Sequence, residues 1–341
     1  MFALTTIDAH AGGAPVRLIT GGAPTPRGRS LREKTAWMQR HADHVRRIVL
    51  LEPRGHRDMT GAMLTEPIAP GSHAGLIFMH ADGYAPMAGH AVIATTMLAL
   101  NRGLLLPGGD GDTVVFDTAA GTVRAHARRP RRSLTDDASD APAVSRVAFT
   151  NVPSFVLAGG LAVKAGGRQV RVDVAYGGAF YAIVDAESLG VSVATDYLPL
   201  LRQFSREITD AVEAALVVVH PSDPQLKGLA GTVYTAPADD ARAQLRTIAV
   251  LADGAAGRAG SGTGMSAVMA VLDAMGLLAD ASEGGPFVLE GMTGSRLEGR
   301  VGQRTMVGEL PAVVPEIEGT AWLTGEHRFV VDPADPFSPQ P

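Results

Sequence analysis

The chain has 341 residues, 46% of them apolar and 19% charged, which is enough to bury a sizeable core in two domains or one large one. The net charge of −5 argues against nucleic-acid binding, and the absence of cysteine excludes disulfides, cysteine metal sites and thiol nucleophiles. The sequence has no run of about 18 apolar residues and no basic-then-apolar leader, so we expect a cytoplasmic protein without a membrane span.

The first part of the chain is predicted to be rich in strands. In chain order the patterns indicate two strands within 4–20, a charged surface helix over 31–48, a buried strand over 74–80, a helix from 89 and a hairpin over 113–125. Ser30 is placed to cap the helix over 31–48, and Gly103 is placed to end the helix from 89 in a left-handed conformation.

A change of composition separates this part from the rest. Residues 128–132 are basic and several aspartates follow, so residues 128–143 are predicted to form a loop near a domain boundary. Beyond it the patterns predict strands at 145–150, 169–175, 180–184, 231–235 and 247–251, a helix over 198–219, a helix from 262 that ends at Gly276, and short strands over 286–331.

Two turns of small residues stand out, at 87–90 and 260–264, and each opens directly into an apolar helix. A helix that is apolar all round is normally buried in a domain core, and Met265, Met269 and Met275 are expected to fill that core. The free N–H groups at such a helix start attract an anion, for example a carboxylate. Two such ends in one chain therefore predict two half-sites that face one small acidic ligand.

Several ordered segments carry a resemblance to a known family: residues 7–17, 52–61, 151–155, 173–181 and 291–301, together with the two glycine turns. In these segments, which run along most of the chain, the sequence resembles the proline racemase family. That family includes 4-hydroxyproline epimerases and trans-3-hydroxyproline dehydratases. The lead-in over 83–87 and the Ala91-Val92 pair look most like the dehydratase branch.

The resemblance implies an α/β (α+β) fold of two similar lobes, each a curved, mostly antiparallel sheet around a central buried helix, as in diaminopimelate epimerase. We therefore expect a first lobe over 1–143 with its central helix from 89, and a second lobe over 144–311 with its central helix from 262. The tail over about 312–341 is a candidate to return to the first lobe. The ligand is expected between the lobes.

The chemistry of the family depends on residues that this chain has lost. Inverting an α-carbon requires one acid/base group on each face, and in the family these are usually two cysteines, one at each helix start. Here the two positions hold Ala88 and Ser261, and a family aspartate is replaced by Gly257. These losses argue against a two-base racemase. Dehydration is less demanding, because one base takes the α-proton and the neighbouring hydroxyl leaves.

By resemblance, the site residues follow from the two helix starts. Ser261 and His90 are the candidate catalytic residues, although a serine hydroxyl is a weak base without an activating partner. Gly89, His90, Gly262 and Thr263 are the candidate substrate-binding residues, since their backbone N–H groups are placed to hold the substrate carboxylate and to stabilise the charge that builds on it.

The first expectation is therefore a cofactor-free lyase that dehydrates trans-3-hydroxy-L-proline to a cyclic imine acid. An epimerase or racemase of 4-hydroxyproline or proline with atypical residues stays open as an alternative, as does a catalytically silent imino-acid binder. The expected partner is a small imino acid, with a homodimer left open, and neither nucleic acid nor a membrane is expected. No metal is expected, because the spacing of three scattered histidines matches no ligand pattern: His10, His56 and His80.

Overall fold

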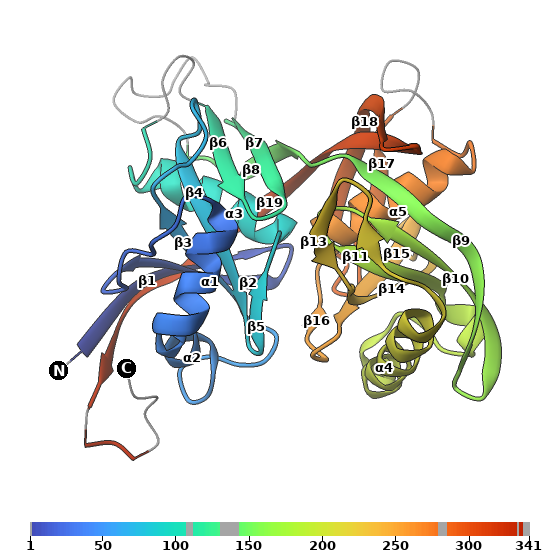
Figure 1. Ribbon diagram of the computed structural model, residues 1–341, viewed down its shortest axis with the longest axis horizontal. Coiled ribbons are helices and arrows are strands. Elements are labelled where there is room, and N and C mark those ends of the chain that lie inside the picture. The colour runs from blue at the N-terminus through green and yellow to red at the C-terminus, as the bar shows by residue number, and fades with distance from the viewer. Residues whose placement is uncertain (1, 107–111, 130–142, 279–284, 333, 337–341) are drawn as a thin grey trace.

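The computed structural model describes residues 2–106, 112–129, 143–278, 285–332 and 334–336 (Figure 1). Most of the loop predicted over 128–143 lies outside the described residues. The helices are α1 (Leu31–His41), α2 (Asp43–Leu50), α3 (Gly89–Asn101), α4 (Leu198–Ala215) and α5 (Gly262–Ala274), with short 3-10 turns at Ala186–Leu189 and Thr195–Tyr197. The strands are β1 (Phe2–Ala11), β2 (Ala14–Gly21), β3 (Thr60–Thr65), β4 (Ala74–His80), β5 (Gly83–Ala85), β6 (Thr113–Thr118), β7 (Gly121–Arg128), β8 (Arg146–Thr150), β9 (Ser154–Ala165), β10 (Arg168–Tyr176), β11 (Phe180–Asp185), β12 (Val219–His220), β13 (Asp223–Lys227), β14 (Leu229–Pro237), β15 (Leu245–Leu251), β16 (Ala256–Gly257), β17 (Phe287–Gly291), β18 (Arg296–Val307) and β19 (Leu310–Val331).

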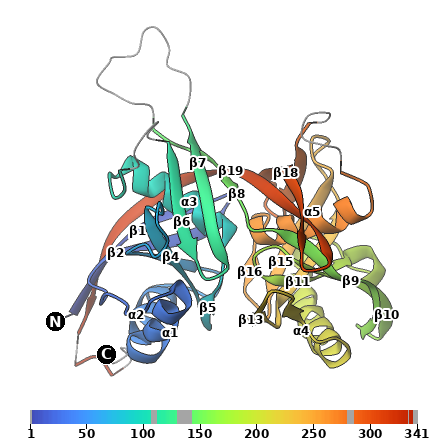
Figure 2. The ribbon, with the colours of Figure 1, turned by 45° about the horizontal axis from the view of Figure 1, so that its top comes forward.

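The elements form two lobes that lie side by side, each with one helix inside its strands (Figures 1 and 2). Helix α3 occupies the first lobe and α5 the second. Strand β19 serves both lobes, because it pairs with β18 and β9 near its start and with β8 and β1 further along. The register Phe2↔Val331 places the two ends of the described chain together in the first lobe. Hydrogen bonds thus connect the two curved sheets without a break.

Strand β8 lies in the first lobe, which corrects the expected start of the second lobe at residue 144. It pairs antiparallel with β7, from Arg124↔Thr150 to Arg128↔Arg146, and with β19. Its apolar residues Val147 and Phe149 are buried in the core cluster around α3. Because these side chains fill the first core, the chain reaches the second lobe only with β9.

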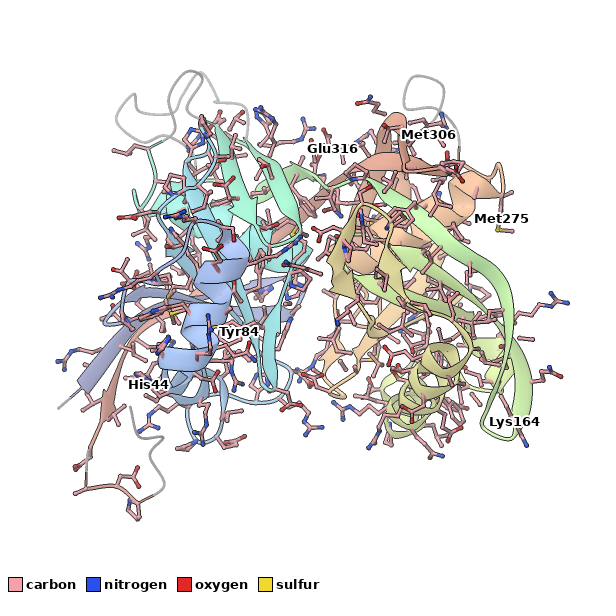
Figure 3. All side chains as sticks on the ribbon, in the orientation of Figure 1. His44, Tyr84, Lys164, Met275, Met306 and Glu316 are labelled. Carbon is pink, nitrogen blue, oxygen red and sulfur yellow. The ribbon has the colours of Figure 1, made fainter. Side chains whose placement is uncertain are left out.

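Both central helices are buried as the sequence predicts. All residues of α3 from 91 to 99 and of α5 from 262 to 271 are buried. Met265 and Met269 of α5 belong to the same core cluster as the apolar residues of α3, so the packing continues from one lobe to the other. Met275 was expected in the core but is 63% exposed. It follows the last residue of α5, and Figure 3 shows its side chain at the outer edge of the second lobe.

The helix predicted over 31–48 is in fact two helices. Ala42 leaves the helical conformation, with φ −144° and ψ 25°, and α2 then starts in a new direction. The break lets α2 bury Val45, Ile48 and Leu50 beneath β3 and β4, which one straight helix along the surface could not do. Helix α4 is shorter than predicted, because Val219 pairs in the small β12–β13 hairpin.

The strands after residue 286 are longer than predicted. Strand β18 has 12 residues and β19 has 22. The many glycines of this region predicted short, interrupted strands. A strand that crosses from one lobe to the other has to be long and must bend, and small residues permit that bend. No helix within the described ranges is long and apolar enough to cross a membrane.

Candidate active site

The first residues of the two central helices touch each other. A Cβ atom added to Gly89 would lie 2.9 Å from the Gly262 Cα atom, and one added to Gly262 would lie 3.1 Å from the Gly89 Cα atom. The ring of Phe149 packs against both glycines, with its Cζ atom 2.9 Å and 3.1 Å from those added Cβ atoms. Only glycine at both positions permits this approach. The two sets of free N–H groups at the helix starts therefore converge between the lobes.

A cavity of about 50 Å³ lies next to this contact. Ala88 and Ser261, the positions where the resemblance puts the two family cysteines, both line it, and so do His90 and Thr263. The structure thus brings the sequence-predicted residues together at one place, with Gly89 and Gly262 in contact beside them. Other residues of both lobes complete the wall: Ala14, Arg57, Asp58, Thr60, His80, Met87, Tyr181, Ala249, Leu251, Ala255, Ala256, Gly257 and Ala259.

A chain of hydroxyl groups runs through the second-lobe side of this cavity. The Ser261 Oγ atom accepts a hydrogen bond from the Gly264 N–H at 3.1 Å and lies 3.0 Å from the Thr263 Oγ1 atom. The Thr263 Oγ1 atom in turn lies 2.8 Å from the hydroxyl of Tyr181. Burial raises the pKa of Tyr181, so its hydroxyl stays protonated. None of these three hydroxyl-bearing side chains is a base, so Ser261 is an oriented hydroxyl without an activating base.

Two histidines line the first-lobe side of the cavity. The His90 Nε2 atom lies 2.9 Å from the Thr60 Oγ1 atom, so this ring is held in place by β3. Burial, with a smaller contribution from the neighbouring His80, lowers the pKa of His90 to about 4. Burial also lowers the pKa of His80, while the carboxylate of Asp253 opposes this shift. Both imidazoles are therefore neutral near pH 7.

A carboxylate from the first lobe lies beside the second-lobe turn over 256–258. Asp58 accepts hydrogen bonds from the backbone N–H of Ala256 at 3.0 Å, from Arg258 at 2.9 Å and from Arg202 at 3.2 Å. Burial alone would raise the pKa of Asp58, but the Ala256 N–H and the Arg258 guanidinium hold it below its usual value. The carboxylate is thus ionised, and it ties the first lobe to the turn that contains Gly257.

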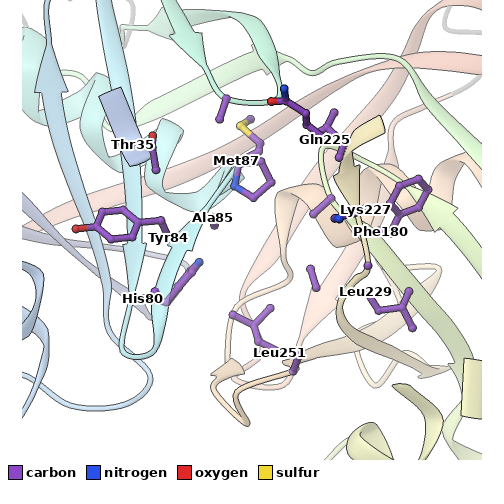
Figure 4. A pocket seen from close by; sticks show the side chains of 18 of the residues that line it. Thr35, His80, Tyr84, Ala85, Met87, Phe180, Gln225, Lys227, Leu229 and Leu251 are labelled. Carbon is purple, nitrogen blue, oxygen red and sulfur yellow. The ribbon is translucent and has the colours of Figure 1, made fainter. Parts of the chain in front are cut away.

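A larger cleft of about 520 Å³ adjoins the small cavity and shares four of its residues: His80, Met87, Tyr181 and Leu251. Figure 4 shows this cleft with Thr35, Tyr84 and Ala85 on one side and Phe180 and Leu229 on the other. Across it, Arg32 of α1 bonds to Asp223 of the β12–β13 hairpin. The cleft lies between the lobes and borders the cavity at the helix starts.

The sequence patterns missed three of the polar groups at this site. His80 was set aside as a scattered histidine, although its place at the end of a buried strand was a usable signal. Asp58 lies in a polar stretch without periodicity, and Tyr181 lies in an ordinary strand pattern, so nothing local indicated that either would reach the helix starts. Within the described residues, no three side chains of metal-ligating type are gathered into a metal site.

Comparison with known proteins places this arrangement in a family. The profile described as proline racemase matches residues 6–339. The chain belongs to the proline racemase family. A trans-3-hydroxy-L-proline dehydratase from Bacillus cereus is 38% identical over 331 residues, which cover 97% of this chain and 95% of that protein. A 3-hydroxyproline 2-epimerase from Burkholderia multivorans is 35% identical over 336 residues, covering 98% and 96%.

Solved structures share the fold of this proline racemase family member. The crystal structure of a hydroxyproline epimerase from Agrobacterium vitis, with bound trans-4-hydroxy-L-proline, superposes with a TM-score of 0.88 at 26% identity and covers 99% of this chain and 94% of that one. A PhzF-family protein from Bacillus anthracis shows the same fold at 12% identity, with a TM-score of 0.57 over 97% and 100% of the chains. The predicted fold class is therefore confirmed.

Proposed function

We propose that this protein dehydrates trans-3-hydroxy-L-proline to a cyclic imine acid without a cofactor. The observation that carries the proposal is an asymmetry between the helix starts. The residue that caps the second helix is Ser261, which has a hydroxyl, whereas the residue before the first helix is Ala88, which cannot move a proton. A racemase needs an acid/base group on each face of the α-carbon. A dehydratase needs such a group on one face only.

The stereochemistry of the substrate fits a single acid/base group. In trans-3-hydroxy-L-proline the hydroxyl lies opposite the carboxylate, so the α-proton and the hydroxyl occupy the same face of the ring. One group on that face takes the α-proton, the double bond forms between C2 and C3, and the C3–O bond breaks as the hydroxyl leaves as water. The enamine product then shifts a proton to become the cyclic imine acid.

Substrate binding in this proposal depends on the two helix starts. The N–H groups of Gly89, His90, Gly262 and Thr263 hold the carboxylate and stabilise the negative charge that it gains when the α-proton leaves. His90 and Ser261 are the proposed protic groups next to the ring. The names of relatives at 34–38% identity, mostly trans-3-hydroxy-L-proline dehydratases, support this substrate over 4-hydroxyproline.

The test is incubation of the protein in heavy water with trans-3-hydroxy-L-proline, trans-4-hydroxy-L-proline and L-proline in parallel, followed by NMR. We expect the cyclic imine acid from the first compound only. Inversion of trans-4-hydroxy-L-proline at a comparable rate would replace the proposal with an epimerase. Binding of an imino acid without deuterium exchange or product would indicate a catalytically silent binding protein. This is the second candidate function, and it is favoured by Ala88, which cannot move a proton.

A gain-of-function variant tests whether positions 88, 257 and 261 correspond to the catalytic positions of the family. Restoring Cys at positions 88 and 261 and Asp at position 257 (Ala88→Cys, Ser261→Cys, Gly257→Asp) supplies the two thiols and the carboxylate that the family usually carries. We expect this triple variant to exchange the α-proton and to invert proline or hydroxyproline measurably above the unmodified protein. Absence of any exchange in a folded triple variant would contradict the alignment of these positions with the family site.

A further inference from the structure

The proposed function leaves open which group removes the α-proton. We propose that His80 removes it, acting from the first lobe on the face where Ala88 carries no acid/base side chain. This inference rests on the proposed function, since it assigns the base for that reaction. Ser261, a hydroxyl without an activating base, then only contacts the substrate, so a single face still carries the acid/base group. His80 therefore becomes a catalytic residue beside the substrate-binding helix starts.

The position of His80 is fixed by the backbone around it. It is the last residue of β4 and pairs with Gly83 in the tight turn to β5, which leads directly to Ala88 and α3. The side chain of Arg46 donates to the backbone carbonyl of His80 at 3.1 Å and also to that of Ala81. These contacts hold the end of the strand while leaving the imidazole itself free of them.

The imidazole of His80 faces both the small cavity and the outer cleft. It lines each of them, and Figure 4 shows the ring extending from β4 toward the space between the lobes. Ala88 lies in the wall of the same small cavity, and Ser261 lines it from the second lobe. The imidazole thus comes from the same lobe as the empty cysteine position.

His80 differs from the other protic groups in the hydrogen bonding of its side chain. The His90 ring is bonded to Thr60, and the Ser261 hydroxyl is bonded to Thr263 and to a backbone N–H. Among the residues that the structure describes, no hydrogen bond is formed by the ring nitrogens of His80. A base must have a lone pair directed at the proton that it takes, and His80 meets that condition with no competing partner.

The surroundings of His80 suit a base that must first accept and then return a proton. Burial keeps the pKa of His80 low, so the ring is neutral and has a free lone pair near pH 7. Asp253 of the second lobe also lines the outer cleft and attracts the protonated ring electrostatically. The imidazolium that forms after proton removal is therefore stabilised by this carboxylate.

The step balances without any co-reactant. The His80 ring nitrogen takes the α-proton while the electron pair of the C–H bond forms the C2–C3 double bond. The C3–O bond breaks, and the departing hydroxyl takes the same proton back from the imidazolium and leaves as water. His80 ends neutral and ready for the next turnover, which a single group on the shared face of the α-proton and the hydroxyl permits.

The experiment compares His80→Gln and His80→Asn with the unmodified protein in two assays, calorimetric binding of trans-3-hydroxy-L-proline and formation of the cyclic imine acid. General-base catalysis contributes about 10²–10⁴-fold, so we expect kcat to fall at least about a hundredfold in both variants. Binding should stay within about threefold, because the helix starts that hold the carboxylate are unchanged. A matched control is His126→Gln, an exposed histidine on β7, for which we expect unchanged binding and turnover.

The outcomes separate this inference from the proposed function. If the unmodified protein turns over trans-3-hydroxy-L-proline and either His80 variant stays within about threefold of it, the His80 assignment is overturned and the proposed function stands. If the unmodified protein forms no imine acid, both are overturned. If turnover is lost while ligand binding and the thermal midpoint are retained, His80 is supported as the base. Recovery of turnover by added imidazole in a His80→Gly variant supports it independently.

Discussion

Replacing Gly89 with alanine tests whether the two helix starts touch, which is the contact on which the whole site depends. The new Cβ atom would lie 2.9 Å from both the Gly262 Cα atom and the Phe149 Cζ atom. Carbon atoms pack at about 3.5–4.0 Å, so one helix start has to move by roughly 0.6–1 Å. Overpacking of this kind costs about 1–3 kcal/mol. The better helix propensity of alanine returns about 0.5–1 kcal/mol, so the middle of the two ranges leaves a net loss of about 1 kcal/mol.

The assay for this variant is urea unfolding, with binding of trans-3-hydroxy-L-proline measured in parallel. The matched control is Gly285→Ala, because a Cβ atom there meets nothing within 4 Å and no left-handed backbone is involved. At such a compatible position alanine stabilises by about 0.4–1 kcal/mol, so the two variants should shift in opposite directions. The reasoning is refuted if Gly89→Ala is as stable as the unmodified protein and binds the ligand equally well.

Three other changes probe the polar groups around the cavity. Tyr181→Phe removes the partner of Thr263, so urea unfolding should show a loss of about 0.5–1.5 kcal/mol; a more stable variant would argue against the hydroxyl chain. The pKa of His90 is lowered from 6.5 to about 4, so the unfolded chain binds a proton that the folded protein excludes, and the free energy of unfolding should fall as the pH drops from about 6.5 toward 4. His90→Gln should flatten that dependence, and an unchanged slope would contradict the assigned shift. Asp58→Asn breaks partly buried ion pairs between the lobes and should cost about 1–2 kcal/mol, between the values for surface and buried pairs. The exposed control Glu326→Gln removes only a surface pair with Arg102 and should change stability less. Equal losses in the two variants would show that the tie between the lobes contributes nothing.

The buried helices show what a one-dimensional pattern can establish. The run after Gly89 and the run after Gly262 lack a polar face, and such a segment can only be stable where protein surrounds it. Their burial was therefore predictable from composition alone, as was the chemical character of their first residues. The left-handed conformations that end both helices were predictable too, since Gly103 (φ +63°) and Gly276 (φ +71°) are glycines placed just after the apolar runs.

The three wrong fold predictions share one physical cause. Each depends on packing against an element that lies far away in the sequence. The break at Ala42 has no local signal, because alanine is a good helix former, and only the burial of α2 beneath β3 and β4 explains it. Strand β8 was assigned to the wrong lobe because its alternation fits either core, and Phe149 settles the choice by filling the space beside the two helix starts. The exposure of Met275 likewise depends on where the second lobe ends.

For the site itself, the sequence determined which groups begin the two helices and which proton carriers are missing there. Those facts are local, because the identity of a residue does not depend on its neighbours in space. Only the tertiary structure decided that Gly89 and Gly262 meet and that Asp58 reaches the turn of the opposite lobe. It also decided that the His80 imidazole has no hydrogen-bond partner among the residues that the structure describes. Each of these depends on long-range strand pairing, which no run of neighbouring residues encodes.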